Sequence, residues 1–231
     1  MSTKKFCVIG LGHFGLNLAK ILSTAGAEVL AIDNHQEKID LIADKVTHAV
    51  CMDSTDKKTL QSLGLNDMDA VIIAIGEGFE SSLMTTAIVQ EFGIKKIYAR
   101  VTSPVHERLL RLMNITDLLV PEADAAAQFA SRLLIPGVIG SFSISKDFGI
   151  FEIKAPKIFI NKTILEIDLR KKYLINLVTI KRIKKSRGLL TLAEHEEVDV
   201  MGVPKPDLII LENDILVLFG KEKDVSKLLE V

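Results

Sequence analysis

The chain has 231 residues, of which 48% are hydrophobic and 26% are charged, and its net charge is −1 at pH 7. This length is ample for one large domain or two small ones, and the charge balance argues against bulk nucleic-acid or membrane binding. No apolar run approaches the ~18 residues of a membrane-spanning helix, and no secretory segment opens the sequence. We therefore expect a cytosolic protein.

Strand and helix patterns alternate through the first 120 residues. Helical spacing marks the faces Leu18–Ala25 and Ile39–Val46 and three further helices at Thr55–Leu63, Ser81–Phe92 and Pro104–Met113. Apolar runs predict strands at Phe6–Gly10, Val29–Asp33, Ala49–Met52, Ala70–Ile75, Ile97–Val101 and Leu118–Val120. This alternation with short connections predicts an α/β fold, a Rossmann-like doubly wound parallel sheet.

The two cysteines and the few aromatic residues narrow the function further. Cys7 and Cys51 both fall in expected buried strands, so we expect buried free thiols. No Cys-x-x-Cys site or His/Cys cluster with zinc spacing occurs. With no Trp and 5% aromatic residues, a stacking platform for single-stranded nucleic acid is not indicated.

The first strand runs into Gly10-Leu-Gly12-His-Phe-Gly15, a Gly-x-Gly-x-x-Gly loop that opens a helix. Gly10 permits the tight turn, Gly12 lets a pyrophosphate approach the backbone, and Gly15 lets the helix pack close to the strand. The helix N-terminus attracts the anion. Asp33 closes the second strand, where it would accept hydrogen bonds from ribose hydroxyls and repel a 2′-phosphate, which disfavours an NADP-like ligand. The alternative is a loop whose glycines only tighten a turn.

Other strand ends at the same expected edge carry candidate ligand contacts. Asp53 would bind the adenine amino group, or act with Ser54 as the cap of the next helix. Gly76 would let the backbone approach the nucleotide, or be a plain loop glycine, and Arg100 would pair with a phosphate, stack on a base, or form a surface salt bridge. The candidate nucleotide-binding residues are Gly10, Gly12, His13, Phe14, Gly15, Asp33, Asn34, Asp53, Ser54, Gly76, Glu77 and Arg100.

The pattern changes after Pro121. We expect a nucleotide-binding lobe at 1–134 that ends in an Ala-rich helix, a hinge at 135–141, and a smaller α+β C-terminal lobe at 142–231. Glu122 opens the helix, where it would complement the helix dipole or bind a divalent cation near a polyphosphate. The expected elements of the C-terminal lobe are strands at Ile150–Ala155, Leu174–Arg182, Leu189–Leu192 and Ile215–Gly220, and helices at Thr163–Lys172 and Glu222–Glu230.

The glycine loop, Asp33, the Cys51–Thr55 segment, Pro121-Glu122 and the β-rich tail that ends in Val203–Gly220 occur in one order. That order resembles the regulator of potassium conductance domain of Ktr/Trk-type potassium uptake systems. The resemblance implies a cytosolic regulatory subunit, not an enzyme. It implies a homo-oligomer, typically an octameric ring, docked on a potassium-translocating membrane subunit at the inner face of the membrane. The balanced charge of the chain predicts no nucleic-acid partner.

The resemblance also implies ligands. ADP and ATP would compete at the glycine loop and change the shape of the ring, and Glu122 would help bind Mg²⁺ or Ca²⁺ near the γ-phosphate between subunits. Cyclic di-AMP would bind the C-terminal lobe across its dimer interface. There the resemblance assigns an apolar wall to Ile164 and Leu165, and the phosphate and adenine contacts to Arg170 and Asn176. Pro206 would supply an edge from the partner lobe, and Lys172 also belongs to the expected site. A surface Arg with a capping Asn is the alternative reading.

One position departs from the family pattern, which often has Arg between the second and third glycines. This chain has His13 there. Because imidazole is mostly neutral at pH 7, we expect a weaker preference for ATP over ADP, and ATP affinity that rises toward pH 6.

The rival class is an NAD-dependent oxidoreductase, which the glycine loop and Asp33 fit equally well. A dehydrogenase needs a positioned acid or base beside its substrate. The two tyrosines, Tyr98 and Tyr173, are not in a Tyr-x-x-x-Lys arrangement, and the five histidines show no carboxylate partner by spacing. A sensor needs only ligand sites and a hinge, so the sequence favours a regulator.

Overall fold

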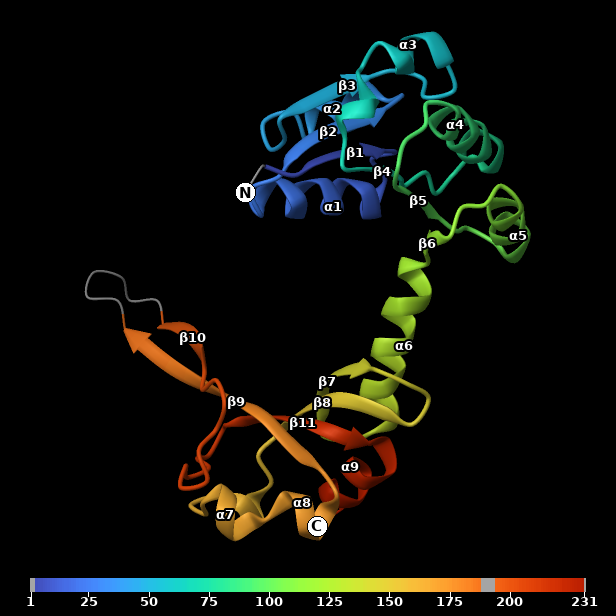
Figure 1. The fold of residues 1–231 in the computed structure, drawn as a ribbon. Coiled ribbons are helices and arrows are strands. Elements are labelled where there is room, and N and C mark those ends of the chain that lie inside the picture. Colours follow the sequence, from blue (N-terminus) through green and yellow to red (C-terminus); the bar gives the residue numbers. More distant parts are fainter. Residues whose placement is uncertain (1–2, 188–193, 231) are drawn as a thin grey trace. The chain divides into compact units, whose positions relative to one another are not determined.

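The computed structural model describes residues 3–187 and 194–230, and the chain divides into two compact units, Met1–Glu122 and Ala123–Val231. Each unit contains its own sheet and its own hydrophobic core (Figure 1). Among the described residues, no helix has the length and apolar character needed to cross a membrane.

The sheet of the first unit is parallel and six-stranded, in the order β3-β2-β1-β4-β5-β6. This is the doubly wound order whose direction reverses beside β1, so the Rossmann-like prediction is confirmed. β4 is buried along its whole length, as expected for a parallel strand covered on both faces. The strands are β1 (Lys5–Ile9), β2 (Glu28–Asp33), β3 (His48–Cys51), β4 (Ala70–Ile73), β5 (Ile97–Arg100) and β6 (Asp117–Leu119).

Helices cover both faces of this sheet. One apolar cluster joins Ile9 of β1 to side chains of α3, α4 and α5, and the other joins Val8 of β1 to α1 and α2. Adjacent residues of a strand point to opposite faces, which explains why one strand serves both clusters. The helices are α1 (His13–Thr24), α2 (Gln36–Asp40), α3 (Lys57–Gln61), α4 (Phe79–Glu91) and α5 (Pro104–Leu112), with a short 3-10 helix, η1, at Leu65–Asp67.

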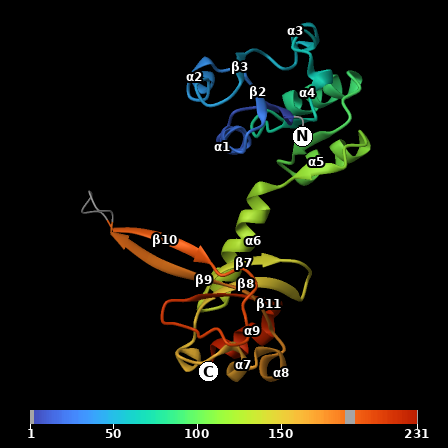
Figure 2. The same cartoon turned by 60° about the vertical axis from the view of Figure 1, so that its left-hand side comes forward.

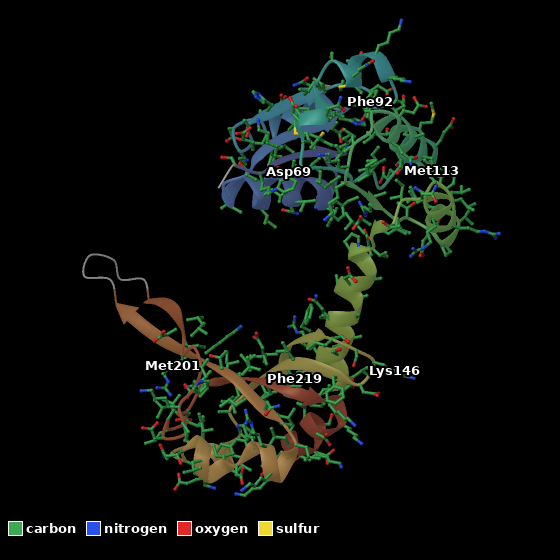
Figure 3. The ribbon with its side chains drawn as sticks, in the orientation of Figure 1. Asp69, Phe92, Met113, Lys146, Met201 and Phe219 are labelled. Carbon is green, nitrogen blue, oxygen red and sulfur yellow. The ribbon has the colours of Figure 1, made fainter. Side chains whose placement is uncertain are left out.

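Two side-chain contacts hold the outer parts of this unit in place. Gln90 of α4 donates from Nε2 to the carbonyl of Met113, 2.8 Å away, just after α5 ends. At the start of β1, Asp69 accepts hydrogen bonds from the Lys4 ammonium and the Lys5 backbone N–H. Figure 3 labels Asp69 and Met113 at these two places.

Two expectations for this unit were wrong in detail. Cys7 is fully buried and burial raises the pKa of its thiol, but Cys51 is exposed because it ends the edge strand β3. The cap of α3 is Asp56, whose carboxylate accepts hydrogen bonds from the Lys58 and Thr59 backbone N–H groups, and not Asp53 or Ser54. The helix begins two residues later than the sequence pattern indicated.

The second unit contains an antiparallel sheet in the order β10-β9-β11-β8-β7. Helices α8 and α9 pack on this sheet, and the β9–β10 hairpin extends beyond them (Figures 1 and 2). Its elements are β7 (Val138–Ser143), β8 (Phe148–Lys154), η2 (Lys157–Phe159), α7 (Ile164–Ile167), α8 (Leu169–Tyr173), β9 (Asn176–Arg187), β10 (Glu194–Val200), β11 (Ile215–Lys221) and α9 (Glu222–Leu229).

A buried ion pair fixes the edge of this core. The guanidinium of Arg182 donates two 2.8 Å hydrogen bonds to the carboxylate of Asp214, which is fully buried. Asp214 also accepts a hydrogen bond from the Leu211 backbone N–H. Because Asp214 is satisfied on both oxygens, this pair specifies how β9 meets the turn before β11.

The connection between the units differs from the sequence expectation. Helix α6 (Pro121–Leu134) is present as predicted, but the division falls after Glu122, near its start. Residues Val138–Ser143 form the strand β7, so residues 138–141 of the expected hinge at 135–141 belong to the sheet.

Two further differences concern the second unit. The expected single helix at Thr163–Lys172 is two short helices, because Asp168 adopts φ +50° between them. Strand β10 was not expected. The predicted strand at Leu189–Leu192 lies wholly outside the described residues.

Candidate functional site

A cavity of about 570 Å³ lies at the carboxyl ends of the strands of the first unit. Strand ends of a doubly wound sheet are where such folds bind their ligands. The cavity is lined from the ends of five strands and from the loops and helices that follow them. The lining residues are Ile9, Gly10, Gly12, His13, Asp33, Asn34, His35, Lys38, Met52, Asp53, Ser54, Ile75, Gly76, Glu77, Ser81 and Arg100.

The glycine loop has the geometry that the motif requires. Gly10 has φ +94°, and a Cβ there would lie 2.9 Å from the Ile75 backbone nitrogen. A Cβ on Gly15 would lie 1.9 Å from the Gly10 carbonyl oxygen, so the close helix–strand contact needs glycine. Gly12 differs, since nothing lies within 4 Å of a Cβ built on it. The open side of the loop at Gly12 therefore leaves space for a phosphate group beside the N-terminus of α1.

Asp33 is held at the end of β2 by hydrogen bonds to both carboxylate oxygens. Oδ2 accepts from the Leu11 backbone N–H at 2.7 Å and from Lys38 Nζ at 3.2 Å. Oδ1 accepts from the His35 backbone N–H at 2.9 Å and lies 3.1 Å from His35 Nδ1. Burial raises the pKa of Asp33, but these hydrogen bonds outweigh it and lower the pKa below its ordinary value. The carboxylate is therefore ionised at neutral pH, as a ribose-binding acid must be.

His35 and Lys38 line the cavity, although sequence reasoning did not include them in the site. His35 follows β2 by two residues and Lys38 lies in the short helix α2. Their spacing from Asp33 was the available signal, because a turn directly after a strand returns toward the strand end.

Arg100 lies deep in the cavity wall and is fixed from three sides. Its guanidinium forms an ion pair with Glu122 and lies over the ring of Phe14, 5.9 Å from the centroid. A Cβ on Gly76 would lie 2.5 Å from Arg100 Nη1, so glycine leaves the room that the guanidinium occupies. Arg100 Nε is buried and makes no hydrogen bond within the described residues. This arrangement places a fixed cation in the cavity that the glycine loop also lines.

The remaining predicted residues take different places. Asp53 and Asn34 line the cavity, while Ser54 lines it and also shares a 2.8 Å hydrogen bond with Thr85. Asp53 is partly committed, because its Oδ1 accepts hydrogen bonds from the Thr55 N–H and hydroxyl. Phe14, Gly15 and Glu122 do not line the cavity, but Phe14 and Glu122 contact Arg100, which does.

A second cavity, of about 340 Å³, lies in the second unit. Four of the predicted cyclic dinucleotide residues line it, namely Ile164, Leu165, Arg170 and Pro206. Pro206 comes from the same chain, and its carbonyl accepts a 2.9 Å hydrogen bond from the Leu165 N–H. Lys172 and Asn176 do not line the cavity, and Lys172 Nζ donates instead to the Glu166 carbonyl at 3.0 Å.

The described residues contain no cluster of three His, Cys, Asp or Glu side chains that could hold a metal ion by itself.

Comparison with known proteins matches both units. Residues 6–121 match the TrkA-N domain and residues 149–231 match the TrkA-C domain. The chain is 35% identical to the Ktr system potassium uptake protein C of Bacillus subtilis, over 97% of this chain and 95% of that protein. It is 32% identical to the Ktr system potassium uptake protein A of the same organism, over 98% of this chain and 96% of that protein.

Among solved structures, the GsuK channel matches 98% of this chain and 39% of its own, with a TM-score of 0.64 and 17% identity. The GsuK RCK domain matches 98% of this chain and 47% of its own, with a TM-score of 0.62 and 18% identity. These two structures support the fold. The domain matches and the two Bacillus subtilis relatives show that the chain belongs to the family of Ktr/Trk-type potassium uptake proteins that join a TrkA-N domain to a TrkA-C domain.

Proposed function

We propose that the chain is the cytosolic regulatory subunit of a potassium uptake system and that it is switched by adenine nucleotides at the cavity of its first unit. The observation that carries the proposal is the convergence of three groups at one strand edge. The open loop at Gly12 would take the phosphates, Asp33 the ribose, and Arg100 would supply the opposing cation. The family relationship supports potassium uptake as the regulated process.

Contact between the nucleotide site and α6 suggests how binding would be transmitted. Arg100 lines the cavity and its partner Glu122 lies in the first turn of α6, the helix that leads into the second unit. A phosphate that binds Arg100 would weaken the ion pair with Glu122 and leave Glu122 available for Mg²⁺ or Ca²⁺. Nucleotides regulate the subunit only if they bind two of its shapes with different affinity.

Exposed apolar side chains support assembly into a homo-oligomer, with an octameric ring as the proposed form. Phe129, Leu133 and Leu134 of α6 are 56%, 68% and 75% exposed, and α6 buries none of its residues within the chain. Contiguous exposed apolar surface indicates an interaction site. The assembled ring would dock on a potassium-translocating membrane subunit at the inner face of the membrane.

The cavity of the second unit supports cyclic di-AMP as a second effector. Ile164 and Leu165 offer an apolar wall, and Arg170 offers a cation suited to phosphate. The carboxylate of Asp168 also lines this cavity and would oppose a phosphate nearby. Substitution Arg170→Ala should therefore abolish cyclic di-AMP binding in calorimetry without changing ADP binding. Intact cyclic di-AMP binding would remove this part of the proposal.

A transport experiment tests the function as a whole. In cells that lack the chain, growth at limiting potassium and uptake of radioactive rubidium should fall, and the wild-type chain should restore both. Gly12→Ala should restore neither, although it should be produced at the wild-type level. Full restoration by Gly12→Ala would refute nucleotide control, and unchanged uptake in the deletion strain would refute the role in potassium uptake.

A further inference from the structure

The carboxylate of Asp33 already accepts its full complement of hydrogen bonds from the chain itself. Leu11 N–H and Lys38 Nζ donate to Oδ2, while the N–H and ring Nδ1 of His35 contact Oδ1. An ionised carboxylate offers about four lone-pair sites. Two ribose hydroxyls can therefore bind Asp33 only by replacing two of the four donors.

The four donors differ in how easily they can be replaced. Those from Leu11 and His35 N–H belong to the backbone at the end of the sheet, where β1 and β2 fix them. The side chains of Lys38 and His35 are 38% and 63% exposed, and both line the cavity. Ribose hydroxyls would therefore replace Lys38 Nζ and the His35 ring, which remain tethered beside the ribose.

The charge around Asp33 differs from that around an acid with no cation beside it. An acid at the end of the second strand normally excludes a 2′-phosphate by repulsion. Here the Lys38 ammonium lies 3.2 Å from Asp33 Oδ2 and balances its charge. Once a ribose replaces Lys38 at the carboxylate, the ammonium is a free donor next to the 2′ position, where a phosphate would give it a charge-assisted hydrogen bond.

We propose that Lys38, assisted by the His35 ring, allows the site to bind a 2′-phosphorylated adenine nucleotide as well as its unphosphorylated form. Lys38 would do so beside Asp33, where the ribose binds. The ligand class therefore includes NADPH-like and 2′-phosphorylated adenosine compounds, which the position of Asp33 in the sequence had disfavoured. The inference rests on the proposed nucleotide site and deepens it by assigning Lys38 as a specificity-determining residue.

The test uses two ligands that differ only in the phosphate, adenosine 5′-monophosphate and adenosine 2′,5′-bisphosphate, titrated into the full chain in a calorimeter. The wild type should bind the two within about 10-fold of each other, a difference of at most ~1.4 kcal/mol. Lys38→Met should weaken the bisphosphate at least about 10-fold relative to the monophosphate, and Lys38→Arg should keep both affinities. NADH and NADPH provide a second matched pair.

Lys45→Met is the matched control. Lys45 follows α2 in the chain, but its Nζ donates to the Leu41 carbonyl and its side chain does not line the cavity. This variant should bind both ligands as the wild type does.

Two results would overturn the inference and leave the nucleotide site standing. One is a wild type that binds the monophosphate but discriminates against the bisphosphate by more than about 10-fold. The other is a Lys38→Met variant in which both affinities change equally. A wild type that binds neither these ligands nor ADP would refute the proposed nucleotide site and this inference together.

Discussion

Arg100 and Glu122 form an ion pair that joins the end of β5 to the first turn of α6. The Arg100 side chain is 17% exposed and that of Glu122 is 63% exposed. Because Arg100 is packed between Phe14 and Gly76, its position is fixed and Glu122 is the partner that can move. The pair therefore connects the wall of the proposed nucleotide cavity to the first turn of α6.

Removing the Arg100 charge should weaken nucleotide binding. Arg100→Met keeps a long apolar side chain against Phe14, and we expect ATP affinity to fall at least about 10-fold, because hydrogen bonds to charged groups contribute roughly 1.5–3 kcal/mol. Calorimetric titration measures this. Arg111→Met is the matched control, since Arg111 pairs with Glu107 on the same helix and does not line the cavity. Equal ATP affinities in the two variants would remove Arg100 from the site.

Removing the Glu122 charge should abolish the effect of Mg²⁺ on ATP binding without weakening ATP binding itself. In Glu122→Gln, Arg100 loses its counter-ion, so ATP should bind at least as tightly as in the wild type when Mg²⁺ is absent. Mg²⁺ should strengthen ATP binding in the wild type but not in the variant, because the cation loses its carboxylate ligand. Titrations of ATP with and without Mg²⁺ measure the two affinities, and Glu107→Gln is the control. A persistent Mg²⁺ effect in Glu122→Gln would exclude Glu122 as a cation ligand.

His13 is expected to set how strongly the site distinguishes ATP from ADP. It is the first residue of α1 and lines the cavity beside the open face of Gly12. His13→Arg places a permanent charge there and should raise the ratio of ATP to ADP affinity, since a guanidinium is always protonated. Titrations of both nucleotides near pH 7 measure the ratio, and a ratio equal to that of the wild type would contradict the assignment.

The buried imidazole of His106 should make the first unit sensitive to mild acid. Burial lowers the pKa of His106, whose Nδ1 lies 3.0 Å from the Thr102 hydroxyl oxygen and whose Nε2 is unpartnered within the described residues. Unfolding exposes the ring and returns its pKa to about 6.5. Below that pH the unfolded chain binds more protons, so stability is complete above about pH 6.5 and is lost as the pH falls toward the lower folded pKa.

Urea unfolding at pH 7.5 and pH 5.5 checks this expectation. The wild type should lose stability between the two pH values, and His106→Phe should lose less, because phenylalanine cannot titrate. The quantity to compare is the change in stability between the two pH values in each protein, and not the stability at either pH. An equal loss in both proteins would show that other groups cause the acid sensitivity.

The positions of the strands and the glycine loop were predictable because their signals are local. Apolar runs identified all six strands of the first sheet to within two residues, and the motif from Gly10 to Gly15 folds through backbone contacts that only glycine allows. The same is true of Asp33, whose position at a strand end sets its contacts.

The features that sequence reasoning missed depend on tertiary contacts. The pairing of Arg100 with Glu122 needs two elements 22 residues apart. Lys38 is the exception, because the turn into α2 brings it back to Asp33 and its spacing in the sequence was an available signal. Cys51 is exposed because β3 is an edge strand, which its apolar sequence does not reveal. β7 was read as a hinge because Pro136 and Gly137 lie immediately before it and mask the strand pattern.

The most direct test of the account is ADP binding to Gly12→Ala. Gly12 has φ −68°, which alanine adopts freely, and nothing lies within 4 Å of the added Cβ, so the variant should fold with the wild-type melting temperature. The methyl group would occupy the space assigned to the phosphates, so ADP affinity measured by calorimetry should fall at least about 10-fold, or ~1.4 kcal/mol. A variant that folds normally and binds ADP as tightly as the wild type would contradict the assignment of this loop as the nucleotide site.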